Sequence, residues 1–293
     1  METPDDVEIE EMVEHLDHWL SKQPHLPQIQ DPDFLRKFLV GCKYRLQNSK
    51  SKIDGYFTAR TMLPDIFRCR DPCDESIRKI SRLCPFFLLD GTTVNGEMVF
   101  VSKADPNVAE IVPMDFVRRL TMVLDVSLLE QKSQLNFIII VDYTGFSFSH
   151  FLKWVTVMKV VLDILIEIYP GRLQSIHAVN CPPFMDKIVT MFNAMVKGPL
   201  RERFFIHSEV NKCHAMIGRD LLPLDLGGDK PSSAELSDEY QKKIESYKNW
   251  FISQEEVKSN EDLRPGSKES GYSFSGSTDF FPVEGSFRRL NVD

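Results

Sequence analysis

Two very apolar segments, joined by an almost wholly apolar stretch, constrain the fold of this chain more than any other feature. Residues 136–142 read Asn-Phe-Ile-Ile-Ile-Val-Asp, a β-branched run typical of a strand buried on both faces of a sheet. Helical spacing follows over residues 147–169, and a Pro-Gly pair ends it before a second apolar run at residues 173–179. Strand, long helix and strand form a βαβ unit, whose strands are parallel neighbours. This half of the chain is therefore predicted to have a mixed α/β fold.

The helices of this region carry very little charge. Between residues 154 and 169 the only charges are Lys159, Asp163 and Glu167, which lie four residues apart and form one narrow polar stripe. Such a helix is either deeply buried or lines an apolar cavity. The next helix, residues 184–197, places Phe, Met, Ile and Val side chains at helical spacing. This stripe fits a core helix, and it also fits a surface that opens, because Met and Phe repack easily.

Composition and charge indicate an ordinary soluble protein. The chain has 293 residues, 42% of them hydrophobic, which is enough for one large domain or two smaller ones. Its formal net charge of -8 argues against non-specific nucleic-acid binding over the whole surface. The acidic start lacks the layout of a secretory signal, and no run of about 18 apolar residues could form a transmembrane helix. Six cysteines without CxxC spacing indicate free thiols, so we expect a cytoplasmic protein.

Periodicity also organises the rest of the chain. Short amphipathic helices are predicted at residues 5–22, 33–42 and 48–62, before any strand signal. Further on, the patterns predict a hairpin of residues 86–89 with residues 97–102, followed by a helix at residues 113–131. They also predict a last strand at residues 204–207 and a terminal helix at residues 236–251. We therefore expect a helical N-terminal module at residues 1–75 and an α/β domain at residues 76–251. A mostly flexible C-terminal tail is expected at residues 252–293.

No catalytic or metal-binding constellation stands out. Neither GxGxxG nor GxSxG occurs. Cys181 lies between a strand and a helix, close to His177, where a thiol could be activated, but the two prolines that follow remove amide donors, which favours a packed thiol. His15 and His18 share one helical face, where a solvated polar surface is far commoner than a metal site. We therefore expect neither an enzyme nor a protein with a metal or cofactor.

Several short motifs follow one another along the chain: Asp33-Phe34-Leu35-Arg36-Lys37-Phe38-Leu39, Asp142-Tyr143-Thr144-Gly145, Tyr169-Pro170-Gly171-Arg172-Leu173, Asn180-Cys181-Pro182-Pro183-Phe184 and Leu222-Pro223-Leu224-Asp225-Leu226-Gly227-Gly228. In this order, across roughly residues 30–250, the chain resembles the CRAL-TRIO lipid-binding family. Within that family it is similar to the branch of α-tocopherol transfer protein and cellular retinaldehyde-binding protein. Its last residues resemble the tails of insect members.

The resemblance implies a three-layer α/β/α domain with a mostly parallel sheet that encloses one lipid. Residues 183–196 would then form a mobile gate over the cavity. On the sheet and its neighbouring helix, the implied pocket residues are Phe137, Val141, Phe146, Val161, Leu165, Tyr169, Leu173 and Ile176. The gate would add Phe184, Ile188, Phe192 and Met195.

The same branch holds a phosphatidylinositol bisphosphate head group on basic residues near the gate. The residues that match these positions or lie beside them are Arg172, Arg203, Arg201 and Lys43. Lys43 is one residue beyond the matching position, which is Cys42, whereas Gln174 and Pro199 stand where further cations are expected. The implied cluster is therefore incomplete. Weaker binding to any anionic surface, or solvated surface arginines, would fit these residues as well.

Two functions from different classes follow from the resemblance. The first is a carrier that binds one hydrophobic ligand, such as a retinoid, tocopherol or carotenoid, and transfers it to membranes. Such a carrier would be a cytoplasmic monomer with peripheral membrane association and no nucleic-acid partner. The alternative is a membrane-docking regulatory or phospholipid-sensing module without carrier activity.

Overall fold

The structure, a computed structural model, describes residues 4–103, 106–107, 110–131, 135–196, 198–207, 210, 213–214 and 217–265. Residues 266–293, which form most of the predicted flexible tail, lie outside this part. Residues 252–265 of that predicted tail are described, and they contact the helical module. Arg264 donates to both carboxylate oxygens of Asp54 at 2.8 Å, and Ser259 Oγ lies 3.0 Å from Thr61 Oγ1.

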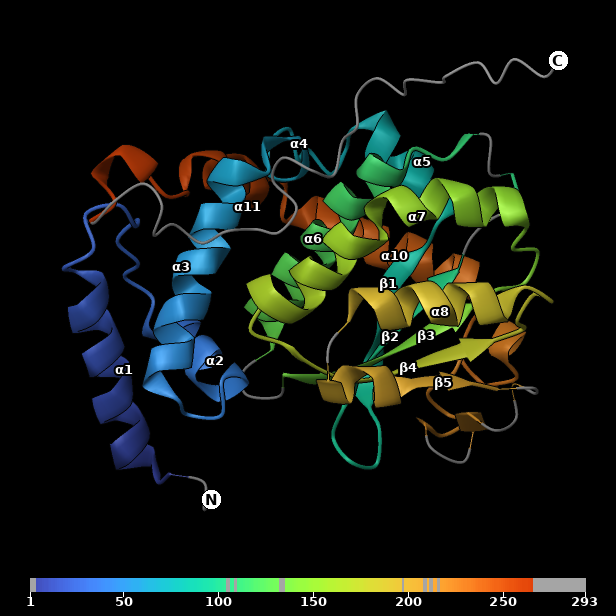
Figure 1. Cartoon of the computed structure of the whole chain (residues 1–293), viewed down its shortest axis with the longest axis horizontal. Coiled ribbons are helices and arrows are strands. Elements are labelled where there is room, and N and C mark those ends of the chain that lie inside the picture. The colour runs from blue at the N-terminus through green and yellow to red at the C-terminus, as the bar shows by residue number, and fades with distance from the viewer. Residues whose placement is uncertain are drawn as a thin grey trace, which may run out of the picture.

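Within the described residues, a five-stranded sheet lies at the centre of the second half of the chain (Figure 1). Its strands follow one another in chain order: β1 (Phe86–Thr92), β2 (Met98–Lys103), β3 (Asn136–Asp142), β4 (Arg172–Val179) and β5 (Phe204–Ile206). β1 pairs antiparallel with β2, and the other neighbours pair parallel. The predicted hairpin, the predicted parallel βαβ pair and the predicted last strand are therefore confirmed.

The helices follow the predicted apolar spacing closely. They are α1 (Asp6–Leu20), α2 (Pro32–Gly41), α3 (Leu46–Met62), α4 (Pro64–Phe67), α5 (Glu75–Leu83), α6 (Pro113–Glu130), α7 (Phe148–Asp163), α8 (Met185–Met195), α10 (Ser233–Ser246) and α11 (Lys248–Ser253). Capping boxes at Asp5, Ser147 and Ser232 fix the starts of α1, α7 and α10 by satisfying amides that the first helical turn leaves unpaired. The sequence patterns missed α4 and α5, which are short.

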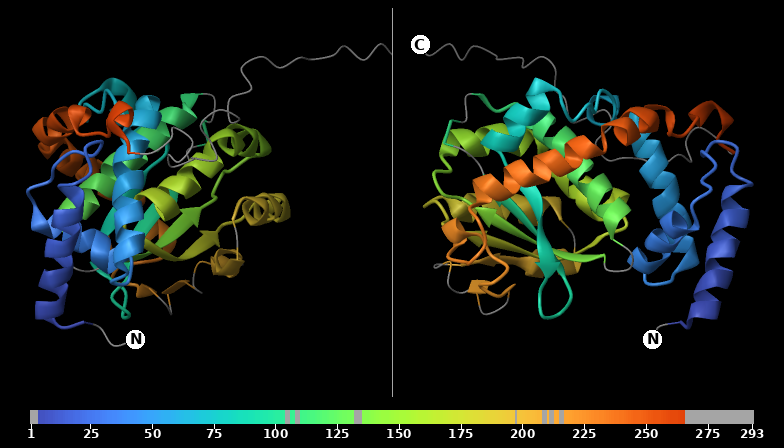
Figure 2. Two further views of the ribbon diagram at one scale, coloured as in Figure 1. Left: turned by 60° about the vertical axis from the view of Figure 1, so that its left-hand side comes forward. Right: turned by 180° about the vertical axis from the view of Figure 1, so that it is seen from behind.

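Helices lie on both sides of the sheet. α7 and α8 lie in front of it in Figure 1, whereas α10 crosses in front of β1 in the rear view (Figure 2, right). α1, α2 and α3 stand together beside the sheet and form the helical module (Figure 1). The chain therefore has the predicted α/β class, with a helical N-terminal module and a mostly parallel sheet between helices.

α7 does not end as an α-helix. Its last turn, Ile164–Ile168, is a π-helix, in which the Tyr169 amide donates to the Ile164 carbonyl oxygen at 3.2 Å. The wider turn leaves the Ile166 carbonyl oxygen available to a side chain, and Lys52 Nζ of α3 donates to it at 2.9 Å. Single π-turns inside α-helices occur frequently at functional sites.

A buried polar cluster, which we call the seam, joins the helical module to α6 and the end of α7. It consists of Tyr56, Arg60, Arg70, Asp125 and Tyr169. The Asp125 carboxylate accepts hydrogen bonds from Tyr56 at 3.0 Å, Tyr169 at 2.8 Å and both arginines. Burial alone would raise the pKa of Asp125, but the two guanidinium groups outweigh it and hold that pKa below its usual range.

Candidate ligand-binding site

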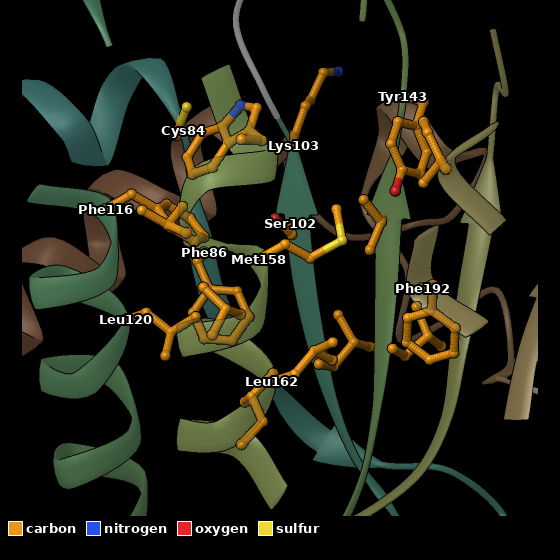
Figure 3. Close-up of a pocket in the computed structure, with 18 of the residues that line it drawn as sticks. Cys84, Phe86, Ser102, Lys103, Phe116, Leu120, Tyr143, Met158, Leu162 and Phe192 are labelled. Atoms are coloured by element: carbon orange, nitrogen blue, oxygen red, sulfur yellow. The ribbon is translucent and has the colours of Figure 1, made fainter. Parts of the chain in front are cut away.

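An apolar cavity lies between the sheet and the helices α6, α7 and α8 (Figure 3). The volume inside it that the centre of a water molecule can occupy is about 180 Å³. One water needs about 10–15 Å³ on that measure, so this void exceeds an ordinary packing defect by about tenfold. All five strands or their ends contribute side chains to its wall. The interior is therefore not filled by its own side chains.

Seven of the predicted apolar residues line this cavity: Val141, Phe146, Val161, Leu165, Ile176, Ile188 and Phe192. Ile139 on β3 and Ile176 on β4 are register partners, and both line the cavity. Because side chains alternate along a strand, Val141, two residues after Ile139, faces the cavity as well. Ile188 and Phe192, one helical turn apart on α8, form the wall on the side of the predicted gate. Their role in ligand binding stays a prediction.

The other five predicted apolar residues do not line the main cavity. Phe137 and Tyr169 line a second hollow of about 20 Å³, and the Tyr169 hydroxyl belongs to the seam. Leu173, the register partner of Phe137 near the start of β4, lies in the wall of the hollow at the amino ends of β3 and β4 instead. Phe184 packs its ring 5.5 Å from Phe148, and Met195 packs on the core beside the cavity. These five residues are therefore placed outside the cavity wall.

Sequence reasoning missed part of the wall. Trp154 and Met158 lie on α7 seven and three residues before Val161, on the same helical face, so the periodicity contained this signal. Phe116 and Leu120 of α6 were recognised as helical apolar residues, but the spacing does not say which neighbour a buried face meets. Tertiary packing decides that assignment.

The polar groups of the cavity gather at the carboxyl ends of β2 and β3. Figure 3 shows Lys103 and Tyr143 at one end of the cavity and Leu120 and Leu162 at the other. Lys103 Nζ lies 3.0 Å from carboxylate oxygens of both Asp142 and Asp225. Of these charged residues, Lys103 and Asp142 line the cavity, whereas Asp225 lies outside its wall.

A third hollow, which we call the basic hollow, opens at the amino ends of β3 and β4. It offers about 390 Å³ on the same measure, and its cations are Lys43, Lys52, Arg172 and Arg203. The other described residues of its wall are uncharged: Asn136, Ile166, Gly171, Leu173 and Gln174. Three of the four predicted basic residues therefore share one hollow, whereas Arg201 donates to the Val196 carbonyl oxygen at 3.0 Å and is not part of the wall.

Lys52 was not predicted, and it is a half-buried cation of the basic hollow. Burial lowers its pKa, and neighbouring Glu167 opposes that effect only in part. Its ammonium group is held by the Ile166 carbonyl oxygen of the π-helix. A lysine on a polar helix such as α3 resembles a solvated residue in sequence, so only the fold places it beside Arg172.

Nucleophile chemistry is not favoured at Cys181 or at the neighbouring histidine. Burial raises the pKa of the Cys181 thiol, which keeps it protonated. His177 Nε2 lies 2.7 Å from Ser175 Oγ, and its Nδ1 lies 2.9 Å from His207 Nε2. Burial and His207 lower the pKa of His177 to about 4, and His177 is only 1% exposed, so this ring is not accessible to a substrate. In the part of the chain that the structure describes, no helix is both long and apolar enough to cross a membrane.

Two domain families match this chain. The Pinta-like UBA domain matches residues 5–77, and the CRAL/TRIO domain matches residues 85–228. The first match covers α1 to α4 and the start of α5, and the second covers the sheet, the cavity and α8. The two matches therefore fall on the helical module and on the cavity-bearing domain, and α10 and α11 lie outside both.

Individual proteins give a consistent picture. Clavesin-1 of Xenopus laevis is 25% identical over 205 residues, which are 69% of this chain and 62% of that protein. Alpha-tocopherol transfer protein-like of Homo sapiens is 26% identical over 211 residues, 70% of this chain and 60% of that protein. The matched region spans about three fifths of the length of these curated relatives. The crystal structure of Sfh5 covers 84% of this chain and 100% of its own, with a TM-score of 0.50 and 15% identity, and shows the shared fold. The chain belongs to the CRAL-TRIO family.

Proposed function

We propose that this protein is a carrier, rather than an enzyme, that holds one hydrophobic ligand in the apolar cavity and transfers it to membranes. The observation that carries the proposal is the void beneath α8, whose wall is almost entirely apolar. Burying about 400 Å² of apolar ligand at about 25 cal/mol per Å² contributes roughly 10 kcal/mol before the costs of binding. Such a ligand is held firmly and is still released when the wall opens.

α8 is the proposed gate. Ile188 and Phe192 form its cavity-facing side, and the Phe192 ring lies 4.9 Å from that of Phe204 on β5. Contacts between Phe and Met side chains adapt to new neighbours without a fixed hydrogen-bond pattern. Displacement of α8 would therefore open the cavity without breaking the sheet.

Membrane docking is supported by an exposed apolar surface next to the gate. At the start of α7, Phe148 is 44% exposed and Leu152 is 55% exposed. Phe148 contacts the Phe184 ring before α8, and Lys187 Nζ lies 5.3 Å from the centre of the Phe148 ring. Apolar side chains beside a cation suit the interface of an anionic membrane. We propose that this surface enters the interface when the cytoplasmic carrier associates peripherally with a membrane.

The basic hollow is the proposed site for a phosphoinositide head group. Four cations converge there without a described carboxylate in the wall, and Arg172 is held in place by the Asn136 oxygen at 2.8 Å. Phosphate groups accept several charge-assisted hydrogen bonds at once, which suits such a cluster. A bisphosphorylated inositol lipid would therefore bind more tightly than a lipid with a single negative charge.

Transfer of a fluorescent apolar lipid analogue between vesicles tests this proposal. We expect the protein to accelerate transfer, and more so when acceptor vesicles contain phosphatidylinositol bisphosphate. The double variant Lys43→Glu/Arg172→Glu should lose most of that extra rate while its occupancy with the analogue stays unchanged. Lys242→Glu, an exposed lysine on α10, is the control for charge reversal.

Two outcomes would contradict the proposal in different ways. Equal rates for the double variant and wild type would overturn the docking site and leave the carrier intact. Vesicle binding without any uptake of the analogue would overturn the carrier and favour a regulatory, phospholipid-sensing module.

A further inference from the structure

The basic hollow lies at the junction of two parts of the chain, and each part supplies two of its cations. Lys43 and Lys52 belong to the helical module, whereas Arg172 and Arg203 belong to the cavity-bearing domain. Burial raises the pKa of the Cys42 thiol, and the charges of Lys52 and Arg172 both oppose that rise, so Cys42 lies close to one cation of each set. The spacing between the lysines and the arginines therefore depends on how the helical module sits on the domain.

One close contact joins the two parts beside the hollow. Gly41, the last residue of α2, is buried, and a methyl group on its Cα would overlap the Pro170 carbonyl oxygen. Because glycine has no side chain, it lets the backbone of α2 approach Pro170 this closely. Gly41 stands two residues before Lys43, and Pro170 stands two residues before Arg172. The contact therefore sets the spacing between one cation of each part.

The backbone that follows Gly41 is strained. Lys43 and Tyr44 have φ angles of +55° and +58°, in the left-handed region that residues other than glycine rarely adopt. The Lys43 amide donates to the Val40 carbonyl oxygen at 3.0 Å, and the Tyr44 amide donates to that of Leu39 at 2.9 Å. Strain of this kind persists where the surrounding structure fixes it, and it clusters at functional sites. Here the strained turn places Lys43 in the wall of the basic hollow.

The other three cations are held by oxygen atoms of uncharged groups: Lys52 by the Ile166 carbonyl, Arg172 by the Asn136 side chain and Arg203 by the Leu173 carbonyl. The described wall of the hollow contains no carboxylate. Cations that are already fixed in place bind an anion at a smaller entropic cost, and phosphate oxygens accept charge-assisted hydrogen bonds from several of them at once. A head group with two phosphates can then reach the lysines with one phosphate and the arginines with the other, provided that the spacing of the two sets fits.

We propose that Gly41 is a positioning residue for the head-group site. This inference rests on the phosphoinositide docking proposed above. Through its contact with Pro170, Gly41 holds the two lysines and the two arginines at the spacing that a head group with two phosphates bridges. A single phosphate contacts one set of cations at a time, so its affinity depends little on this spacing.

Calorimetric titration of the full chain with deacylated head groups, at one fixed salt concentration, tests the proposal. The probes are glycerophosphoinositol bisphosphate and glycerophosphoinositol monophosphate. We expect Gly41→Ala to lower affinity for the bisphosphate about tenfold and affinity for the monophosphate less than about twofold, because only the bisphosphate bridges the two parts. Gly228→Ala is the matched control, since a methyl group there would overlap the Leu222 carbonyl oxygen outside the wall of the basic hollow. It should leave both affinities unchanged.

Two measurements keep the test independent of folding. Retained binding of an apolar fluorophore shows that the cavity-bearing domain is intact in each variant. Amide hydrogen exchange of wild type needs no substitution: the bisphosphate should slow exchange in residues 39–45 and in residues 164–174 together, and more than the monophosphate does. Protection of only one of these segments by the bisphosphate would overturn the proposal.

The failure of this proposal differs from the failure of the docking site. If Gly41→Ala behaves like Gly228→Ala toward the bisphosphate, Gly41 has no positioning role and the head-group site stands. If wild type binds the soluble bisphosphate but not vesicles that contain phosphatidylinositol bisphosphate, docking on a lipid is overturned and the hollow is assigned to a soluble inositol phosphate. Absence of binding to both overturns the docking site and the role of Gly41 together.

Discussion

The seam and the cavity are both buried, yet they use their side chains in opposite ways. At the seam, one carboxylate accepts hydrogen bonds from two tyrosines and two arginines, and the Arg60 guanidinium lies 3.5 Å from the centre of the Tyr56 ring. In the cavity, large apolar side chains surround about 180 Å³ of open space, and the Trp154 indole donor has no partner among the described residues.

The difference separates a region that holds the two parts of the chain together from one that is free to receive a ligand. A close-packed polar cluster loses stability when any member is removed, because its partners remain buried and unpaired. A hollow apolar region tolerates added atoms, because they meet empty space. Stability and binding therefore depend on different residues, and substitutions can test them separately.

Removal of the seam's charge should have the largest effect. Asp125→Asn leaves Arg60 and Arg70 without their shared carboxylate, and we expect it to lower the free energy of unfolding by about 3–5 kcal/mol. The matched control is Asp163→Asn, which breaks a half-buried ion pair with Lys159 on α7 and should cost about 1 kcal/mol or less. Urea unfolding of both variants measures the difference. Equal losses would show that the seam contributes no more to stability than this half-buried ion pair.

Acidification should spare the seam and act on the sheet instead. The pKa of Asp125 is held low, so its charge persists as the pH falls to 4. His177, whose pKa is lowered to about 4 by burial and by His207, takes up a proton more readily in the unfolded chain, where the usual pKa is about 6.5. The contribution of the neutral His177 ring to the free energy of unfolding is complete above pH 6.5. It is lost progressively as the pH falls from 6.5 to 4, and the loss is at most about 3 kcal/mol.

Unfolding free energies measured at several pH values check the histidine's share. His177→Gln lacks the titrating ring and should flatten the dependence between pH 6.5 and 4. An unchanged slope in this variant would assign the pH dependence to other groups.

Enlarging one valine in each region should sharpen the comparison. Val123→Phe on α6 adds atoms to a fully buried, close-packed position and should cost about 1–2 kcal/mol of unfolding free energy. Val161→Phe on α7 adds the same atoms next to the cavity, so we expect a smaller cost and at least about tenfold weaker binding of an apolar fluorophore. Thermal unfolding and fluorophore titration measure the two effects. Similar destabilisation by both variants, with unchanged binding, would indicate that the cavity is not a usable space.

The elements of the fold could be predicted where a periodic apolar pattern is long. The predicted helix at residues 113–131 corresponds to α6 at Pro113–Glu130, and the apolar run at residues 136–142 is β3. The predicted single helix at 236–251 is divided into α10 and α11 at Tyr247. The nine-residue α5 was missed, because its buried residues Ile77 and Ile80 make too short a pattern to stand out.

The site could be predicted less completely, since its walls come from distant parts of the chain. Val161 and Leu165 were predicted from the family resemblance, and the α7 pattern could have added Trp154 and Met158. Lys52 could not be predicted, because its burial depends on contact with a π-helix more than a hundred residues away. Asp125 was likewise not predicted as a paired residue. The sequence of α6 does not indicate that Arg60 and Arg70, which are distant in the chain, pair with this carboxylate.

Native mass spectrometry of the full chain, purified without detergent from cells that supply lipids, tests most directly whether the cavity is a ligand site. We predict one dominant species that carries a single apolar molecule, and we predict that Val161→Phe largely loses this species while remaining folded. A wild-type protein that shows only the mass of the bare chain, under conditions in which it also takes up no added lipid, would contradict the central claim.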